Sequence, residues 1–257
     1  MVTHFIATAP RTHGWKKIWK ITLETWDIHD WIIGMEKGKK GYEHVQIRGS
    51  ISGNYQDFFN WHTHNDTKWH IEPSNTAPFE SSYERKEGHY WSSLDTVEVR
   101  KVRFGNPNTR QKHILRWLES QSDREIDVWL DPSGNNGKSW LAIHLWETGK
   151  ALVIPRSAST PERMSAFVCS AWKGERIIII DIPRAQKIDP KLYETIEELK
   201  DGLVFDHRYY GKTRNVRGTK ILIFTNTPLD TKKLSKDRWR LHGINEGARG
   251  GAPYRNT

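Results

Sequence analysis

The segment 131–139 most narrows the folds open to this chain, because it reads DPSGNNGKS between two apolar stretches. Trp129 and Leu130 come directly before it, and the letters WLA follow it. A glycine-rich loop that ends in Gly-Lys-Ser between a strand and a helix is typical of a phosphate-binding loop. The segment therefore predicts an α/β unit that binds a nucleoside triphosphate.

Gly137, Lys138 and Ser139 are the predicted ligand-binding residues of this loop. The lysine amine of such a loop reaches the β- and γ-phosphates, and the serine hydroxyl ligates Mg²⁺. The strict pattern also has a glycine five positions before Gly137, where this chain has Pro132. We expect Gly134 to supply the tight turn instead.

Two later apolar runs complete the prediction of a parallel sheet. Residues 176–184 read RIIIIDIPR, and a continuous run of isoleucines is typical of a strand buried on both faces. Asp181, at the carboxyl end of that run, is the predicted Walker B residue that holds the Mg²⁺ water. The alternative is an aspartate that caps a turn after a core strand.

The second run is 220–226, KILIFTN, which also ends in a polar residue. Asn226 is predicted to orient the attacking water, and the alternative is a turn residue before Pro228. Residues 234–239, LSKDRW, offer Arg238 as an arginine finger. The alternative is a surface or salt-bridged arginine.

The composition favours a polyanionic partner. The chain has 257 residues, with 40 Lys and Arg against 31 Asp and Glu, and a formal net charge of +9. This balance favours nucleic acid over an acidic protein, although a merely basic protein is the alternative. The single cysteine, Cys169, excludes an internal disulfide framework and a cysteine-based zinc site. No apolar run has the length of a membrane span and no secretory signal is evident, so we expect an intracellular protein without a membrane partner.

Composition shifts and apolar spacing divide the chain into zones. We predict a first domain over 1–92, a linker over 93–109, a second domain over 110–244 and a disordered tail over 245–257. In the first domain we expect strands over 2–9, 31–35, 44–51 and 69–72, and helices over 14–27, 55–62 and 81–87. This alternation predicts a small α+β domain with an antiparallel sheet. Residues 110–120 are predicted to form the helix that opens the second domain.

Two predicted strands of the first domain carry a candidate metal site. Glu36 ends one strand, and His44 and Gln46 open the next on one face, because strand side chains alternate. A carboxylate, an imidazole and an amide oxygen suit Mg²⁺ or Mn²⁺ rather than structural Zn²⁺. The alternative for His44 and Gln46 is an ordinary surface pair.

Tyr83 and Lys86 form a second candidate in the first domain. On the predicted helix over 81–87 they are three residues apart and share a face. Tyrosine can act as a nucleophile in phosphoryl transfer, and a nearby lysine lowers its pKa or steadies a phosphate. The alternative is an exposed charged helix with a packed tyrosine.

Together these motifs resemble the replication initiator proteins (Rep) of small circular single-stranded DNA viruses, which join a rolling-circle nicking endonuclease to a superfamily 3 helicase. The resemblance covers nearly the whole chain and keeps the motif order. The matching segments are FIATAP at 5–10, HVQ at 44–46, Tyr83-x-x-Lys86, 131–139, IIDIPR at 179–184, FTN at 224–226 and LSKDRW at 234–239. The segments 34–38, 83–88 and 120–127 look closest to the smacovirus branch. Many relatives have a second acidic residue after the Walker B aspartate, where this chain has Ile182.

The resemblance implies an α+β antiparallel-sheet nicking endonuclease domain (HUH-like, ferredoxin-like) followed by an α/β P-loop superfamily 3 helicase/ATPase domain. In the first domain, Glu36, His44 and Gln46 would hold Mg²⁺ or Mn²⁺ against a phosphate of single-stranded DNA at an origin stem-loop. Tyr83 would attack that phosphate, leaving a 5′-phosphotyrosine and a 3′-OH that primes host DNA polymerase machinery. The reverse reaction joins ends, and Lys86 would orient the metal or neutralise charge.

In the second domain the resemblance implies ATP with Mg²⁺, bound between the subunits of a ring such as a homohexamer. The helix over 110–120 would join the subunits, and Arg238 would act on the neighbour's γ-phosphate. Residues 203–217 would form a hairpin that grips single-stranded DNA. The predicted DNA-binding residues are Arg208, Lys212, Arg214 and Arg217. The implied location is inside the host cell, and in the nucleus of a eukaryotic host.

Two other functions are left open by the residues. One is a P-loop ATPase that acts on RNA and whose first domain only binds. The other is a non-enzymatic nucleic-acid-binding protein with a decayed nuclease site. The set Glu36, His44, Gln46 and Tyr83 discriminates between these and the initiator, because a pure binding protein has no need of it.

Overall fold

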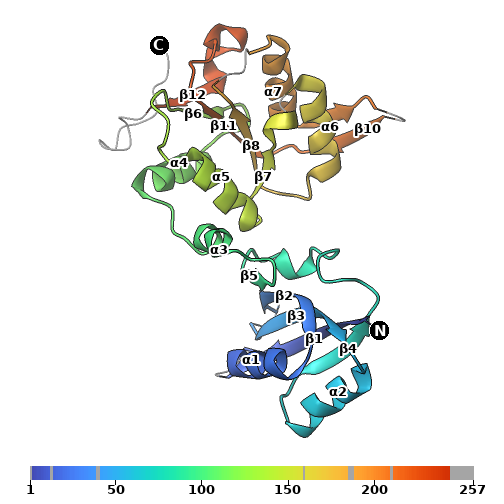
Figure 1. The fold of residues 1–257 in the computed structure, drawn as a ribbon. Helices are drawn as coiled ribbons and strands as arrows, with labels where there is room; N and C mark the ends of the chain where they lie inside the picture. Colours follow the sequence, from blue (N-terminus) through green and yellow to red (C-terminus); the bar gives the residue numbers. More distant parts are fainter. Residues whose placement is uncertain are drawn as a thin grey trace. The chain divides into compact units, whose positions relative to one another are not determined.

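The computed structural model describes residues 2–11, 14–38, 41–158, 160–184, 188–208 and 211–243. The chain divides between Gly105 and Asn106 into two compact units, here called unit 1 (residues 1–105) and unit 2 (residues 106–257). Each unit is built around a five-stranded sheet of its own (Figure 1). The predicted tail over 245–257 lies outside the described residues.

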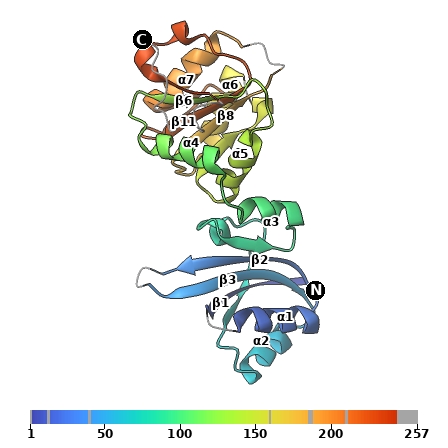
Figure 2. The same cartoon turned by 90° about the vertical axis from the view of Figure 1, so that its left-hand side faces the viewer.

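Unit 1 has an antiparallel sheet with two helices on one face (Figures 1 and 2). Its elements are β1 (Val2–Pro10), α1 (Trp15–Thr25), β2 (Ile28–Lys37), β3 (Glu43–Ser52), α2 (Tyr55–His64), β4 (His70–Ser74), the 3-10 turn η1 (Tyr83–Arg85), β5 (Tyr90–Ser92) and α3 (Val97–Arg103). The strands lie in the order β4-β1-β3-β2-β5, and each neighbouring pair is antiparallel. The first six elements follow the β-α-β-β-α-β order of ferredoxin-like folds. The coarse prediction of an α+β domain with an antiparallel sheet is therefore confirmed.

Alternation along β3 decides which face of the unit 1 sheet is buried. Val45 is fully buried, whereas His44 and Gln46 are partly exposed on the opposite face. The helices α1 and α2 cover the apolar face with aromatic side chains, among them Trp19 and Phe58. The face that carries His44 and Gln46 is therefore left for polar chemistry.

Helix α3 corrects the prediction of a linker over 93–109. Thr96 caps the start of this helix by accepting a hydrogen bond from a backbone N–H of its first turn. At its other end, Arg103 makes a bidentate ion pair with Asp95 at 2.7 and 2.8 Å and donates to the carbonyl oxygen of Tyr90 at 3.0 Å. Both charged side chains are buried, so α3 is fixed to unit 1.

Unit 2 is an α/β unit. Its elements are α4 (Thr109–Glu119), β6 (Ile126–Leu130), α5 (Lys138–Glu147), β7 (Ala151–Ile154), η2 (Arg156–Ala158), α6 (Pro161–Ala171), β8 (Ile177–Ile182), α7 (Lys191–Asp201), β9 (Leu203–Asp206), β10 (Lys212–Asn215), β11 (Lys220–Thr225), η3 (Thr231–Lys233), η4 (Lys236–Arg238) and β12 (Trp239–His242). The main sheet has the order β12-β6-β11-β8-β7 and is parallel throughout. The predicted parallel α/β unit is confirmed.

The parallel pairing brings the carboxyl ends of β6, β11 and β8 side by side at one edge of the sheet. Ligands of open α/β sheets bind at this edge, just beyond the strands. The predicted strand–loop–helix arrangement is present there, because β6 ends at Leu130 and α5 begins at Lys138. Among the described residues, no helix is long and apolar enough to cross a membrane.

Candidate functional site

Strand pairing in unit 1 places Glu36 directly opposite His44. The strands β2 and β3 are antiparallel, and the same register sets Gly34 opposite Gln46. The Nε2 atom of His44 lies 3.4 Å from Oε2 of Glu36. Gln46 shares their face of the sheet, and its Oε1 accepts a hydrogen bond from Oγ1 of Thr8 at 2.8 Å.

The turn η1 adds Tyr83 and Lys86 to this pair. The prediction of a helix over 81–87 is wrong, because only the 3-10 turn forms, with the amide of Lys86 donating to the carbonyl of Tyr83. The turn nevertheless brings the two side chains together, with Nζ of Lys86 3.6 Å from the ring centroid of Tyr83. Nζ of Lys86 lies 3.0 Å from Oε2 of Glu36, and the hydroxyl of Tyr83 donates to the same oxygen at 3.4 Å.

Close packing under η1 explains why this turn lies on the sheet. A Cβ atom at Gly34 would stand 2.2 Å from the carbonyl oxygen of Glu84, so only glycine permits this approach. The fully buried carboxylate of Glu84 accepts a hydrogen bond from Nε of Arg48 at 2.9 Å. Arg48 also donates to Oγ of Ser74 at 2.7 Å. Sequence reasoning missed these contacts, which hold Tyr83 in place.

Two atoms of the unit 1 site have unused capacity. Among the described residues, the buried atoms Oε1 of Glu36 and Nδ1 of His44 have no hydrogen-bond partner. A buried polar atom without a partner is costly unless a ligand or water satisfies it, so each of these two atoms has capacity for a further partner. No group of three or more His, Cys, Asp and Glu side chains among the described residues is arranged to hold a metal, so a third ligand has to be of another type, such as Gln46.

Lys86 carries a positive charge beside the Tyr83 hydroxyl. Partial burial lowers the pKa of Lys86, but its interactions with Tyr83 and Glu36 outweigh burial and raise the pKa above its ordinary value. A lysine cation next to a phenol stabilises the phenolate and attracts a phosphate. Tyr83 itself is half exposed, which leaves its hydroxyl accessible to a large substrate.

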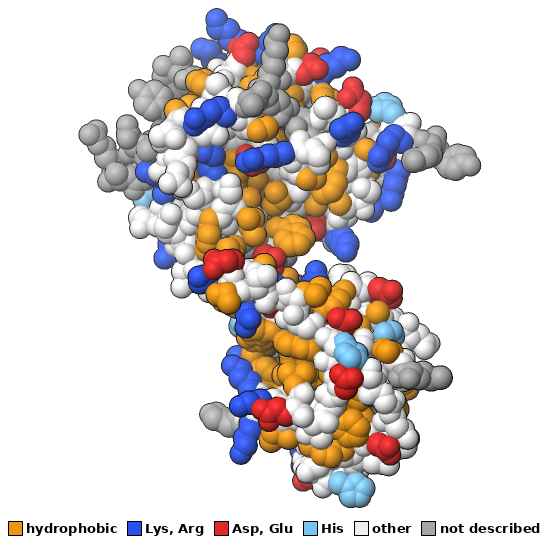
Figure 3. All heavy atoms as spheres, in the orientation of Figure 1, with side chains coloured by type: hydrophobic (Ala, Val, Ile, Leu, Met, Phe, Trp, Pro, Cys, Tyr) orange, Lys and Arg blue, Asp and Glu red, His pale blue; other side chains and the backbone are white. Residues whose placement is uncertain are grey.

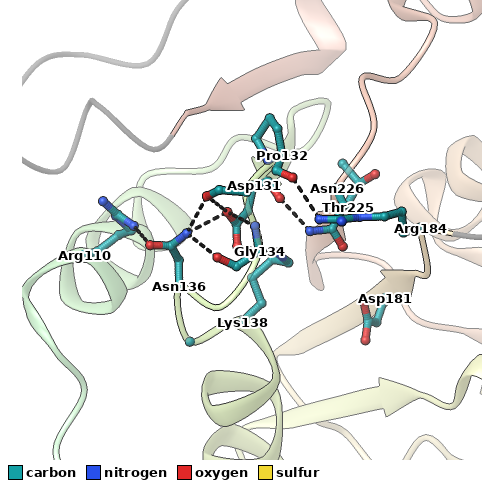
Figure 4. A network of polar contacts seen from close by, with 12 residues as sticks. Arg110, Asp131, Pro132, Gly134, Asn136, Lys138, Asp181, Arg184, Thr225 and Asn226 are labelled. Carbon is teal, nitrogen blue, oxygen red and sulfur yellow. Dashed lines mark hydrogen bonds and ion pairs between the residues drawn. The ribbon is translucent and has the colours of Figure 1, made fainter.

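In unit 2, side chains from three neighbouring strands converge on the loop after β6 (Figure 4). Asn226, after β11, donates from Nδ2 to the carbonyl oxygen of Asp131 at 2.5 Å. Arg184, after β8, donates from Nη2 to the carbonyl oxygen of Pro132 at 2.8 Å. The structure therefore brings the predicted Asn226 to the loop, and it adds Arg184 and Asp131, which sequence reasoning did not select.

The loop itself has the shape that its glycines predict. Gly134 and Gly137 have φ of 76° and 88°, a left-handed conformation that glycine adopts without strain. The side chain of Lys138 turns back under the loop, where Nζ lies 2.6 Å from Oδ2 of Asp131. Ser139 is exposed in the first turn of α5. Asp181 is the penultimate residue of β8 and accepts two hydrogen bonds from Arg156, at 3.0 and 2.8 Å.

Arg238 is buried inside unit 2. Its Nη2 lies 2.9 Å from Oε1 of Glu197 and 3.0 Å from Oδ1 of Asp201, both on α7. Asp237 beside it is held by Arg124 at 2.8 Å instead. The assignment of Arg238 as an arginine finger stays a prediction, and it requires the guanidinium to leave these two carboxylates.

The hairpin predicted over 203–217 is present as the antiparallel pair β9 and β10. Residues 209 and 210 lie outside the residues that the structure describes. Among the predicted DNA-binding residues, Lys212 and Arg217 have exposed side chains. Arg208 is exposed but held by Asp206 at 3.0 Å, and Arg214 donates to the carbonyl of Cys169 at 3.3 Å. On the face drawn in Figure 3, Lys and Arg side chains are spread over both units, with Asp and Glu among them.

Three curated proteins illustrate what the chain is similar to. It is 26% identical over 220 residues to Para-Rep C7 of Faba bean necrotic yellows C7 alphasatellite, covering 79% of this chain and 73% of the relative. It is 29% identical over 115 residues to the Master replication protein of Banana bunchy top virus, covering 44% and 38%. It is 28% identical over 170 residues to Para-Rep C10 of Milk vetch dwarf C10 alphasatellite, covering 60% and 56%. The chain therefore spans less than two thirds of the length of the last two.

Other comparisons add little. No protein-family model matches the chain. A solved formyltetrahydrofolate deformylase from Pseudomonas putida aligns with a TM-score of 0.23 and 11% identity, over 76% of this chain and 65% of that one, which carries no argument about fold or function. The chain is thus similar to viral and alphasatellite replication proteins, and the predicted smacovirus branch stays a prediction.

Proposed function

We propose that this chain is a viral rolling-circle replication initiator that nicks and joins single-stranded DNA and hydrolyses ATP to unwind DNA. One observation carries the proposal: Tyr83 and Lys86 from η1 meet His44 from β3 around Oε2 of Glu36, although Tyr83 and Glu36 are 47 residues apart in the sequence. The similarity to Para-Rep and Master replication proteins supports it. A protein that only binds nucleic acid needs no such cluster.

In the proposed nicking reaction Tyr83 is the nucleophile. Its Oη forms a bond to phosphorus while the bond from phosphorus to the 3′-oxygen breaks, which gives a 5′-phosphotyrosine and a free 3′-OH. Oε2 of Glu36 faces the hydroxyl of Tyr83 and accepts its hydrogen bond. Glu36 and His44, with Gln46, would hold Mg²⁺ or Mn²⁺, which when bound polarises the phosphate. Lys86 balances the charge that develops on the phenolate oxygen.

In the proposed ATPase reaction the loop after β6 holds the triphosphate. Lys138 contacts the β- and γ-phosphates, Ser139 and Asp181 bind the Mg²⁺ and its water, and Asn226 orients the attacking water. The carboxyl-end position of all these residues supports this assignment. A ring of subunits with Arg238 acting in trans, DNA contacts from the hairpin, priming of a host polymerase and action in the host nucleus are further parts of the proposal.

The test is the covalent adduct between protein and DNA. Purified full chain is incubated with Mn²⁺ or Mg²⁺ and a labelled single-stranded stem-loop oligonucleotide, and the adduct is resolved on a denaturing gel. Tyr83→Phe should abolish the adduct, because it keeps the ring and removes the nucleophile. The matched control is Tyr42→Phe, since Tyr42 is also exposed and its ring stacks on His44 at 5.5 Å.

Three results would contradict the proposal. No adduct from the wild-type chain would remove the nicking function. An adduct that persists in Tyr83→Phe and disappears in Tyr42→Phe would move the nucleophile to Tyr42, which mass spectrometry of the linked peptide would show. ATP hydrolysis that depends on RNA, without any DNA adduct, would favour an ATPase that acts on RNA.

A further inference from the structure

The aspartate that opens the phosphate-binding loop is its most connected residue. Asp131 is completely buried directly after β6, and its side chain points into the loop rather than toward solvent (Figure 4). Its backbone N–H donates to the carbonyl of Thr225 on β11 at 2.9 Å, which fixes it to the sheet. An isolated buried carboxylate is costly, so its contacts account for its presence.

One carboxylate oxygen of Asp131 organises the turn. Oδ1 accepts hydrogen bonds from the backbone N–H of Gly134 at 3.0 Å, from Nδ2 of Asn136 at 2.7 Å and from Oγ of Ser133 at 3.2 Å. These donors belong to Ser133, Gly134 and Asn136, which follow Pro132, the residue at the position of the strict motif's first glycine. The side chain of Asp131 thus holds together the turn that Gly134 makes with its φ of 76°.

The other carboxylate oxygen acts on the lysine. Oδ2 of Asp131 lies 2.6 Å from Nζ of Lys138, and both side chains are buried. A lysine ammonium has three N–H donors. One is directed at Oδ2, so the amine is held in a fixed orientation with its other donors available to phosphate oxygens.

We propose that Asp131 is a positioning residue of the nucleotide site, in which Oδ1 shapes the loop and Oδ2 orients the amine of Lys138. The inference rests on the proposed binding of a nucleoside triphosphate by this loop. It assigns the two jobs to separate atoms, so variants on the two sides should have different effects on affinity and turnover.

The Oδ2 side is tested with Asp131→Asn. The amide oxygen can keep the three donors of the loop, and the amide NH2 then faces Lys138, from which it cannot accept a hydrogen bond. We expect kcat for ATP hydrolysis to fall by about 10–10²-fold, because misplacing a reacting group by an ångström has an effect of this size. The Kd of a fluorescent ATP analogue should stay within about threefold, since the loss of the ion pair is offset by the loss of a negative charge beside the triphosphate.

The Oδ1 side is tested with Asn136→Ala. This change removes one donor to Oδ1 and the hydrogen bond from Arg110 to Asn136 at 2.6 Å, but it leaves Oδ2 and Lys138 in contact. We expect the Kd for the ATP analogue to rise by a larger factor than kcat falls. Separate roles are shown if Asp131→Asn acts mainly on kcat and Asn136→Ala acts mainly on Kd.

The matched control is Asp127→Asn. Asp127 is equally buried on β6, but its partners are Gln121, His242 and Arg240 rather than the loop. It should lower Tm without lowering kcat of the folded fraction. Wild-type kcat in Asp131→Asn, or a fall in kcat matched by Asp127→Asn at equal loss of Tm, would overturn the inference. Absence of ATP binding and hydrolysis by the wild-type chain would instead contradict the proposed function.

Discussion

Each unit contains a lysine held by a carboxylate, and the two pairs differ in what surrounds them. In unit 1, Lys86 lies 3.0 Å from Glu36 and its side chain is 38% exposed. In unit 2, Lys138 lies 2.6 Å from Asp131 and its side chain is 10% exposed. The first pair sits where a large substrate can reach it, and the second is enclosed by its own loop.

The two carboxylates also differ in how many of their oxygens already have hydrogen-bond partners. Glu36 directs Oε2 at His44, Lys86 and Tyr83, whereas its buried Oε1 has no partner among the described residues. Both oxygens of Asp131 are occupied by groups of its own loop. Glu36 therefore has capacity for a ligand from outside the protein, and Asp131 has a structural use for each oxygen.

The largest expected effect is the loss of one activity at a time when each lysine is replaced by alanine. Lys138→Ala should abolish ATP hydrolysis and leave nicking intact, and Lys86→Ala should do the reverse. Lys138→Ala leaves a buried carboxylate without its partner and should cost about 3 kcal/mol of unfolding free energy. Lys86→Ala should cost less than about 1 kcal/mol, because that pair is partly exposed. Both activities and urea unfolding are measured for each variant, and loss of both activities in either one would break the comparison.

Acid should weaken unit 1 through His62. This buried histidine of α2 stacks on Trp69 with ring centroids 4.8 Å apart, and burial lowers its pKa to about 4. Between pH 6.5 and 4 the unfolded chain binds a proton that the folded unit does not. Lowering the pH through this range should therefore reduce the free energy of unfolding by about 3 kcal/mol. In unit 2 the buried His242 instead contacts the carboxylate of Asp127 at 2.5 Å.

The measurement is hydrogen exchange of the unit 1 strands at pH 7 and at pH 4.5. His62→Gln keeps a polar side chain and removes the titration, so it should flatten the pH dependence. A dependence as steep as in the wild-type chain would exclude His62 as its source.

Glu36→Gln should weaken divalent-cation binding. Loss of the charge at Oε1 should raise the Kd for Mn²⁺ by about 10–100-fold, a range typical of changes around metal sites. Isothermal titration with Mn²⁺ measures this directly. Glu43→Gln is the control, because Glu43 is a nearby exposed carboxylate whose partner is Arg11 at 3.0 Å. Equal weakening in both variants would mean that Glu36 has no special role.

The smallest expected effect on nicking is that of Gly34→Ala, because it removes no reacting group. The new Cβ would stand 2.2 Å from the carbonyl oxygen of Glu84, so η1 has to shift, which should cost about 1–3 kcal/mol of unfolding free energy and slow adduct formation. Gly38→Ala is the matched control, since its Cβ would lie at an ordinary 3.5 Å from the carbonyl oxygen of Tyr42. Equal rates of adduct formation in the two variants would show that the close packing of η1 on Gly34 does not position Tyr83.

Local pattern predicted most of the elements, and contacts between distant residues account for what it missed. The alternation in 44–51 gave the correct polar face of β3, and the isoleucine run gave β8. The helix over 81–87 failed because Glu84 turns inward to Arg48, a contact across 36 residues that local spacing does not contain. Helix α3 had a local signal, the cap at Thr96, within a stretch whose charges suggested a linker.

The candidate site residues also fall into those that local sequence predicts and those that depend on contacts between distant residues. Lys138 and Ser139 follow from a contiguous motif, and the meeting of Glu36 with His44 follows from strand register. Asp131 was not predicted, because the motif treats its position as variable and its role depends on loop atoms that only the fold brings together. Burial of Arg238 between two carboxylates of α7 likewise depends on packing.

The buried clamp of Arg103 on Asp95 and Tyr90 has a practical consequence for dissecting the protein. A fragment that ends at residue 92, where the composition changes, would lack Asp95 and the helix that carries Arg103. Tyr90 would then lose the guanidinium that lies 3.7 Å from its ring centroid. Nicking by an isolated N-terminal piece is therefore best assayed on one that ends at 105. Inactivity of a shorter piece would report a damaged sheet edge rather than a missing catalytic group.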